Sequence, residues 1–299
     1  MTHTATIAAS ESDATQLAEE IANDPFLDGQ TVDSSEVSPG RWEVVVYFSE
    51  APDKEQRAAL KRHGRFTIAE LAETDWVAKS LAGLSPVRAG PFLVHGSHDR
   101  AAARENDIAI EIEAGEAFGT GHHGTTAGCL NEIARIAQTR PILNALDVGT
   151  GSGVLAFAIA RIAGAPVLAS DIDPVATRVA AENARINGVA RFVRTVTATG
   201  LDGRIFHEHA PYDLVVANIL AGPLAALAPA IARVTAPGGA VVLSGLLPSQ
   251  KARIVAAYRT AGLLLERATV HDGWLTLVLI RPAKAKGRHQ RHRPSQLSR

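Results

Sequence analysis

A glycine-rich run that follows an apolar segment constrains this chain more than any other feature. Residues 146–153 read Leu-Asp-Val-Gly-Thr-Gly-Ser-Gly and lie between the apolar residues 141–146 and the helix-like residues 154–163. An acidic cluster that includes Asp171 and Asp173 closes the next apolar run. Strand, glycine turn, helix, strand and carboxylate together form one half of a nucleotide-binding α/β unit.

The three glycines of the run, Gly149, Gly151 and Gly153, suit a turn that bends sharply and lets backbone approach a ligand without a Cβ in the way. Their spacing is Gly-x-Gly-x-Gly, whereas the dinucleotide fingerprint is Gly-x-Gly-x-x-Gly. This departure disfavours a pyrophosphate seated on the helix N-terminus.

Two carboxylates after the second strand have different expected roles. Asp171 ends the strand, and there it can accept hydrogen bonds from both ribose hydroxyls of an adenosine ligand. Asp173 precedes Pro174 and is expected to cap the next helix. Asn218 ends a later apolar run at the carboxyl edge of the sheet, where open α/β sheets bind ligands. Its amide fits either helix capping or contact with a ligand.

The C-terminal two thirds of the chain alternates between strand and helix patterns. This alternation predicts an α/β fold with a mostly parallel seven-stranded sheet covered on both faces. The expected strands are 142–148, 167–171, 192–197, 213–218, 240–244, 263–269 and 274–280, and the expected helices are 154–163, 174–187, 220–234 and 248–260. Because only residues 270–273 separate the last two strands, these two should form an antiparallel hairpin at one edge.

The chain is expected to divide into four parts. Residues 1–81 contain a strand pattern at 42–48 and a helix pattern at 54–63, which fit a small α+β domain such as a split βαβ. Breakers between residues 82 and 91 indicate a linker, and residues 92–281 hold the α/β domain. Residues 282–299 carry six Lys or Arg and no acid, so they fit a disordered tail or a non-specific contact with RNA.

Composition narrows the class of protein further. The formal net charge of −1 gives no whole-chain attraction to nucleic acid or to an anionic membrane. The single cysteine, Cys129, excludes an internal disulfide and fits a cytoplasmic protein. Residues 214–232 carry no charge, but Asn218, Gly222-Pro223 and Pro229 interrupt them. They fit a buried strand followed by a packed helix rather than a membrane span.

Residues 118–126, Phe-Gly-Thr-Gly-His-His-Gly-Thr-Thr, precede a helix pattern that runs through residue 136. Their glycines and threonines make a poor core segment and a good loop over a ligand. The adjacent His122 and His123 would point apart on an extended loop. Cys129 and Glu132 beyond them match no familiar metal-ligand spacing. We therefore expect no metal site.

The glycine run and the cluster at 171–174 resemble the class I S-adenosylmethionine-dependent methyltransferases. Three further segments, at residues 117–126, 217–224 and 243–247, are similar to the PrmA-type methyltransferases, which act on large-subunit ribosomal protein eleven. The resemblance covers roughly residues 76–281. It implies S-adenosyl-L-methionine as cofactor, a large-subunit ribosomal protein as substrate and an N-terminal module that captures it.

Residue by residue, the resemblance implies cofactor contacts at Thr126, at Gly149 in the turn that also holds Gly151, at Asp171 and at Asn218. The family loop usually reads Gly-Thr-Gly-Thr-His-Pro-Thr-Thr. This chain has His122 in place of the second Thr and Gly124 in place of Pro, which we expect to make the loop more flexible and to alter acceptor contacts.

Methyl transfer from a sulfonium requires alignment of donor, methyl group and nucleophile. An acceptor lysine must first lose a proton, and the motif residues include no evident general base. We expect desolvation to lower the pKa of the amine and the carbonyl oxygen of Asn218 to orient it. Three alternatives fit the sequence less well: a methyltransferase for another protein or small-molecule amine, a nicotinamide-dependent oxidoreductase, and a non-catalytic sensor of S-adenosylmethionine.

Overall fold

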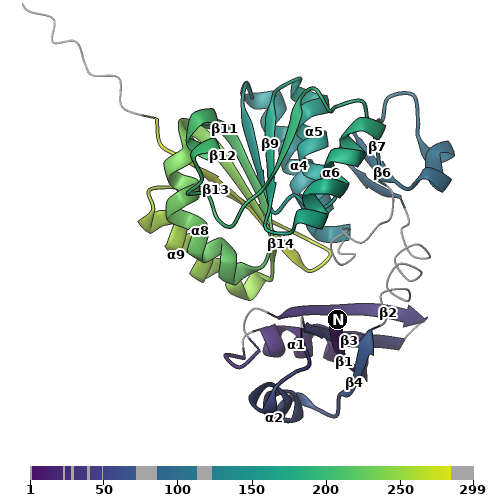
Figure 1. The fold of residues 1–299 in the computed structure, drawn as a ribbon. Coiled ribbons are helices and arrows are strands. Elements are labelled where there is room, and N and C mark those ends of the chain that lie inside the picture. Colours follow the sequence, from purple (N-terminus) through teal and green to yellow (C-terminus); the bar gives the residue numbers. More distant parts are fainter. Residues whose placement is uncertain are drawn as a thin grey trace, which may run out of the picture.

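The computed structural model describes residues 2–22, 24–27, 30–38, 41–48, 50–71, 86–112 and 123–283. Figure 1 shows two units, a small N-terminal sheet with two helices and a larger sheet with helices on both faces. This arrangement confirms the predicted fold class: a mostly parallel α/β sheet preceded by a small α+β domain.

The N-terminal unit has the split βαβ arrangement that the sequence suggested. Its four strands are ordered β2-β3-β1-β4, and every neighbouring pair is antiparallel. The elements are β1 (Thr2–Ala9), α1 (Glu11–Ala22), β2 (Thr31–Ser38), β3 (Arg41–Phe48), α2 (Lys54–His63) and β4 (Thr67–Leu71).

Local sequence explains two elements of this unit. In β3 the side chains of Val44, Val46 and Phe48 alternate into the core, as period-two patterning requires. Helix α2 starts at a capping box, in which the Asp53 side chain accepts from the Gln56 backbone N–H and the Gln56 side chain accepts from the Asp53 backbone N–H.

Three short strands precede the large sheet and correct the expected linker. They are β5 (Val87–Ala89), β6 (Phe92–His95) and β7 (Ile108–Glu111), and a 3₁₀ segment, η1 (Ser97–Ala102), connects the last two. Strand β5 pairs with β6, so Gly90 and Pro91 form a hairpin turn. The breakers that suggested a linker at 82–91 therefore belong in part to this small sheet, and residues 82–85 lie outside the described residues.

The large sheet has seven strands in the order β10-β9-β8-β11-β12-β14-β13. Its strands are β8 (Ala145–Val148), β9 (Val167–Asp171), β10 (Val193–Thr197), β11 (Tyr212–Asn218), β12 (Thr235–Leu246), β13 (Leu264–His271) and β14 (Trp274–Ile280). All neighbours are parallel except that β14 runs antiparallel to both β12 and β13. The expected edge hairpin is confirmed, and β13 forms the outer edge.

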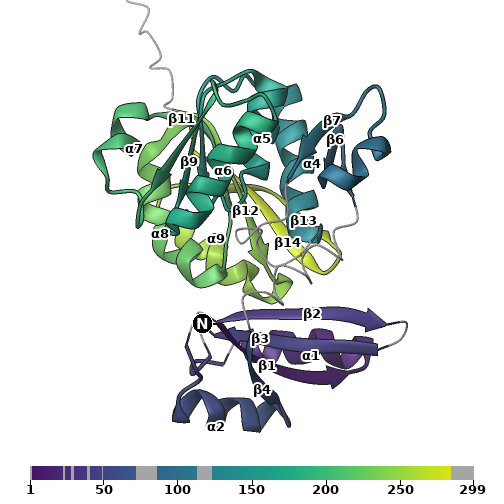
Figure 2. The same cartoon turned by 45° about the vertical axis from the view of Figure 1, so that its right-hand side comes forward.

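Helices cover both faces of this sheet (Figure 2). Apolar side chains of α4, α5 and α6 join one buried cluster, and those of α7, α8 and α9 join the other. The helices are α4 (His123–Thr139), α5 (Val154–Ala163), α6 (Pro174–Ile186), α7 (Arg204–His209), α8 (Ala221–Val234) and α9 (Lys251–Thr260). Two sheet faces covered by helices explain why the strands read as near-continuous apolar runs.

Several expected boundaries shift. Strand β12 extends well beyond the expected 240–244, and a 3₁₀ turn, η2 (Pro248–Gln250), precedes α9. Helix α7 was not predicted, because six residues are too few to show a helical period. The charge-free residues 214–232 divide between β11 and α8, as expected. In the described part of the chain, no helix combines the length and apolarity needed to cross a bilayer.

Candidate active site

The carboxyl ends of three adjacent strands bring the predicted ligand-binding residues together. Strand β8 lies between β9 and β11, and Val148 pairs with Ser170 on one side and with Ala217 on the other. The residues that follow these three along their strands are therefore neighbours at one edge: Gly149, Asp171 and Asn218.

The turn after β8 requires glycine at its first position. Gly149 has a φ of 71°, which favours glycine, and a Cβ built there would lie 2.3 Å from the Cγ2 of Ile219. The backbone N–H groups of Gly149 and Thr150 both donate to the Ser170 carbonyl, at 2.8 and 2.9 Å. The turn is thereby fastened to β9 and lies against the residue that follows Asn218.

Asp171 is half-buried and fixed by two backbone donors. Its Oδ2 accepts from the Gly151 N–H at 2.9 Å and its Oδ1 from the Asp173 N–H at 3.0 Å. A carboxylate offers about four lone-pair positions, so acceptor capacity remains for hydroxyl groups of a ligand. Asp173 instead caps α6 by accepting from the Val175 N–H at 2.8 Å, which confirms the role expected for it.

Asp147 lies beneath the turn and is only 1% exposed. Its Oδ2 accepts from the Thr150 hydroxyl at 2.7 Å and from the Ala156 N–H at 3.1 Å, which ties the turn to the start of α5. Its Oδ1 has no hydrogen-bond partner among the described residues. Burial raises the pKa of Asp147 to about 7, and the negative charge of Asp171 adds to the rise.

Asn218 forms a hydrogen bond with the first turn of α4. Its Nδ2 donates to the Oγ1 of Thr125 at 3.2 Å, so the amide turns its nitrogen toward α4. Among the described residues no donor bonds its Oδ1, which can accept from a ligand. Thr126, the expected cofactor contact, is the next residue of α4 and is half-buried. Residues 113–122, including His122, lie outside the described residues.

The start of α4 corrects the expected extent of the loop. The helix begins at His123, so Gly124 and both threonines belong to its first turn rather than to a flexible loop. A Cβ at Gly124 would lie 2.8 Å from the His271 carbonyl oxygen and 3.1 Å from the Cδ1 of Trp274. The turn between β13 and β14 therefore packs directly on α4, and the absence of a larger residue at 124 permits this contact.

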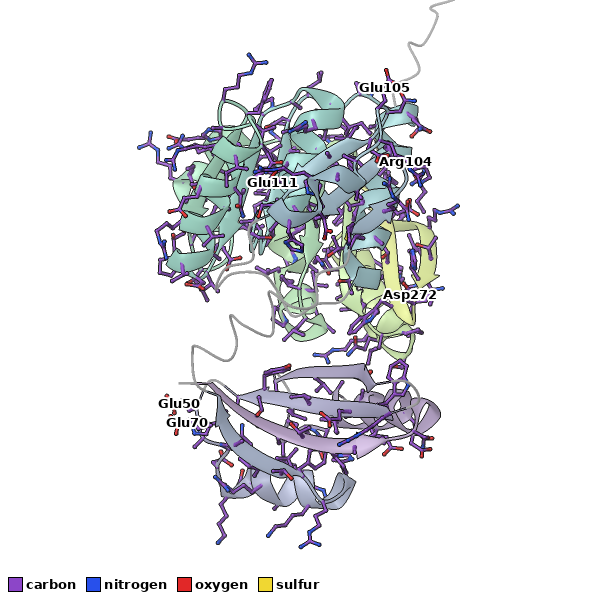
Figure 3. The ribbon with its side chains drawn as sticks, turned by 90° about the vertical axis from the view of Figure 1, so that its right-hand side faces the viewer. Glu50, Glu70, Arg104, Glu105, Glu111 and Asp272 are labelled. Atoms are coloured by element: carbon purple, nitrogen blue, oxygen red, sulfur yellow. The ribbon has the colours of Figure 1, made fainter. Side chains whose placement is uncertain are left out.

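A hollow of about 520 Å³ adjoins this edge of the sheet. One wall comes from the large unit and begins at Leu220, two residues after Asn218; it continues through Gly245 and the β13–β14 turn. Figure 3 labels Asp272 at that turn, on the side that faces the small unit. The opposite wall comes from the N-terminal unit and is formed by Ala18, Ala22, Gln30, Val32, Ser34 and Trp42.

These features fit an adenosine ligand. The glycine turn lets a ligand come close to the backbone, and Asp171 keeps acceptor capacity for the vicinal hydroxyls of a ribose. Ile172, the next residue, is 68% exposed and offers an apolar surface beside that carboxylate.

The sequence predicted Gly149, Gly151, Asp171 and Asn218 as cofactor-binding residues together with Thr126, and the fold brings the first four together at one edge of the sheet. It did not identify Thr125 as a partner of Asn218 or Asp147 as the group that holds the turn. The position of Asp147 directly before the glycine run was the only signal for it.

The described residues contain no cluster of three or more His, Cys, Asp or Glu that could hold a metal ion.

Comparisons with known proteins agree with this geometry. The family model described as ribosomal protein L11 methyltransferase (PrmA) matches residues 3–282. A ribosomal protein L11 methyltransferase from Rhizobium etli is 49% identical over 289 residues, which cover 92% of this chain and 98% of that protein. One from Brucella suis is 53% identical over 258 residues, covering 84% and 90%. A crystal structure of ribosomal protein L11 methylase from Lactobacillus delbrueckii subsp. bulgaricus superimposes with a TM-score of 0.60 at 28% identity, covering 67% of this chain and all of that one.

Proposed function

Because this chain belongs to the ribosomal protein L11 methyltransferase (PrmA) family, we propose that it methylates amines of ribosomal protein L11. The acceptors are lysine ε-amines, the N-terminal α-amine or both. S-adenosyl-L-methionine is the methyl donor of this methyltransferase, and it supplies an electrophilic methyl group on a sulfonium. The observation that carries the proposal is the row of Gly149, Asp171 and Asn218 at the ends of three adjacent strands.

We assign cofactor binding to the residues of this row and to their neighbours. Asp171 accepts from the ribose hydroxyls, since two backbone donors already fix its orientation. Gly149 and Gly151 have no side chains, so the cofactor can lie directly against the backbone of the turn. Thr126 contributes from the first turn of α4, next to the threonine that bonds Asn218.

Asn218 orients the acceptor amine. Because its Nδ2 is engaged by Thr125, its Oδ1 is the atom of the amide that accepts a hydrogen bond from the amine. When Oδ1 accepts one N–H of the neutral amine, the amine is held with its lone pair directed at the methyl group. Alignment of this kind supplies several kcal/mol toward a displacement. The amine reacts in its neutral form, which desolvation in the hollow beside Leu220 favours.

The N-terminal unit, in the proposed division at residues 1–81, recognises the protein substrate. Residues 1–71 contain 13 acidic and 6 basic residues, whereas the whole chain is close to neutral. A protein that binds ribosomal RNA presents basic surface to phosphates, and an acidic module complements it. The hollow walled by both units gives a lysine side chain a route from this module toward Asn218.

The proposal also includes RNA as a partner and the cytoplasm as the location of the protein. Residues 282–299 contact RNA through their six Lys and Arg side chains; residues 284–299 of this segment lie outside the described residues. A cytoplasmic location follows from a ribosomal protein as substrate. The names of the relatives disfavour the oxidoreductase and the non-catalytic sensor.

Transfer of labelled methyl from S-adenosyl-L-methionine to purified L11 of the same cell tests the proposal, with Asp171→Ala as the matched variant. Labelling of L11 that is lost in the variant supports donor and acceptor together. Cofactor binding without labelling of L11 would reject the acceptor and leave another protein or a small-molecule amine in its place.

A further inference from the structure

Helix α9 lies in a part of the chain that carries only positive charge. Residues 214–265 contain no Asp or Glu. Four cations occur in this stretch of 52 residues: Arg233, Lys251, Arg253 and Arg259. Three of the four belong to α9, a helix of ten residues. The near-neutral balance of the whole chain therefore conceals a local excess of positive charge.

The cations of α9 are exposed and are not neutralised by neighbours. Within the described ranges, neither Lys251 nor Arg259 forms an ion pair or a side-chain hydrogen bond. Arg233 on α8 faces Asp202 at 3.5 Å, and both of those side chains are mostly exposed. The next acid after α9, Glu266, bonds Arg135 and Arg140 on the α4 side of the sheet. In the part of the chain that the structure describes, no acid of α8, η2 or β13 forms an ion pair with a cation of α9.

The two ends of the helix present their cations on one side. Lys251 and Arg259 are eight residues apart, about 12 Å along the helix axis at 1.5 Å per residue. Both line a shallow groove of about 390 Å³ whose floor includes Ala252, Ala256 and Leu265. The small side chains between the two cations let the backbone of an extended ligand lie close to the helix. Each cation can then contact a separate anionic group of that ligand.

The C-terminal segment leaves the sheet beside this groove. Leu264, which follows α9 and starts β13, pairs with Ile280 at the end of β14. The six cations of residues 282–299 thus follow directly from the strand end that lies next to the end of α9.

From this arrangement we infer that the outer face of α9 binds the phosphate backbone of RNA, with Lys251 and Arg259 as its two contacts. A polyanion with regularly spaced phosphates matches cations held at two points along a helix. An anionic membrane fits less well, because the exposed positions of α9 lack the large apolar side chains that enter a bilayer. This inference does not depend on which amine is methylated.

The test is binding of the full-length protein to a fluorescent single-stranded oligouridylate, measured by anisotropy across a range of salt concentrations. The double variant Lys251→Ala/Arg259→Ala is compared with Lys54→Ala/Lys61→Ala, which removes two exposed cations of α2 in the acidic N-terminal unit. Loss of two phosphate contacts should reduce the slope of log K against log salt by about 1.4, and affinity at 0.1 M salt should fall on the order of tenfold.

The control pair should leave slope and affinity unchanged. Equal behaviour of the two double variants would overturn the inference. So would weakened binding to phosphatidylglycerol vesicles with RNA binding intact. A third variant with all six tail cations changed to Gln isolates the helix, and the effect of Lys251→Ala/Arg259→Ala should persist in that background. Methyl transfer to free L11 in the same samples reports the proposed function separately, and neither double variant should change it.

Discussion

The side-chain amide of Asn218 donates a hydrogen bond of 3.2 Å to the hydroxyl of Thr125. The two residues lie 93 positions apart in sequence, one at the end of β11 and the other in the first turn of α4. This bond directs the amide nitrogen toward α4 and leaves the carbonyl oxygen for the acceptor amine of the proposed mechanism. The orientation of Asn218 thus depends on a residue that need not touch either substrate.

Thr125→Val should lower kcat for methyl transfer about fivefold, since a lost neutral hydrogen bond amounts to about 1 kcal/mol. Affinity for the cofactor should change little, because Thr125 acts through Asn218. Thr125→Ser keeps the hydroxyl and should restore the rate. Steady-state kinetics with L11, together with calorimetric titration of S-adenosylhomocysteine, separate the two effects. A valine variant with the wild-type kcat would show that the Thr125 bond does not orient Asn218.

Asp171→Asn should weaken cofactor binding by about tenfold to a hundredfold, since hydrogen bonds to a charged group contribute about 1.5–3 kcal/mol. An amide at this position must also direct its NH₂ at one of the two backbone donors that now bond the carboxylate. Asp173→Asn is the matched control, because Asn caps helices about as well as Asp. Titration calorimetry measures both variants; equal losses at the two positions would contradict the different roles given to these acids.

Gly149→Ala should destabilise the fold by about 1–2 kcal/mol through the left-handed backbone and by a further ~1–3 kcal/mol through contact with Ile219. Only the second part can be relieved by shortening the neighbour. Denaturant unfolding of a double-mutant cycle with Ile219→Ala should therefore show a smaller cost for Gly149→Ala in the shortened background. Identical costs in both backgrounds would mean that Ile219 does not limit the turn.

The buried Asp147 should make stability depend on pH. Its native pKa of about 7 lies above the value of about 3.9 expected in the unfolded chain. Between these values the native state holds the extra proton, so the free energy of unfolding should fall as pH rises from about 4 to 7 and level off above that.

Asp147→Asn mimics the protonated side chain and should remove this contribution. The difference between wild-type and variant unfolding free energies, measured by urea titration from pH 5 to 8, should therefore change by up to about 1.4 kcal/mol per pH unit below pH 7. Titrating groups that do not interact with Asp147 cancel in that difference, and Asp171, whose charge contributes to the shift, ionises mostly below this pH range. Parallel curves for the two proteins would show that Asp147 titrates normally in the folded state.

Residues with strong local signals were predictable from the sequence. The turn at Gly149 and the carboxylate at Asp171 follow from glycine spacing and strand patterning, and α5 has the limits expected from its apolar run. The bond between Asn218 and Thr125 was not predictable, because it depends on how α4 docks against the sheet. The hairpin at Gly90 was taken for a linker because turn residues look alike in both settings.

The position of β14 affects how this protein can be made. Among the described residues this strand is the last in the sequence, yet it lies between β12 and the edge strand β13. While a ribosome is still synthesising residues 274–280, β13 has no strand to pair with, and β12 presents an open edge. Bare edges of this kind favour association with other chains. A stop codon before residue 274 would therefore leave β12 with an unpaired edge and β13 without a partner. We expect the truncated protein to aggregate rather than to fold as a slightly shorter enzyme.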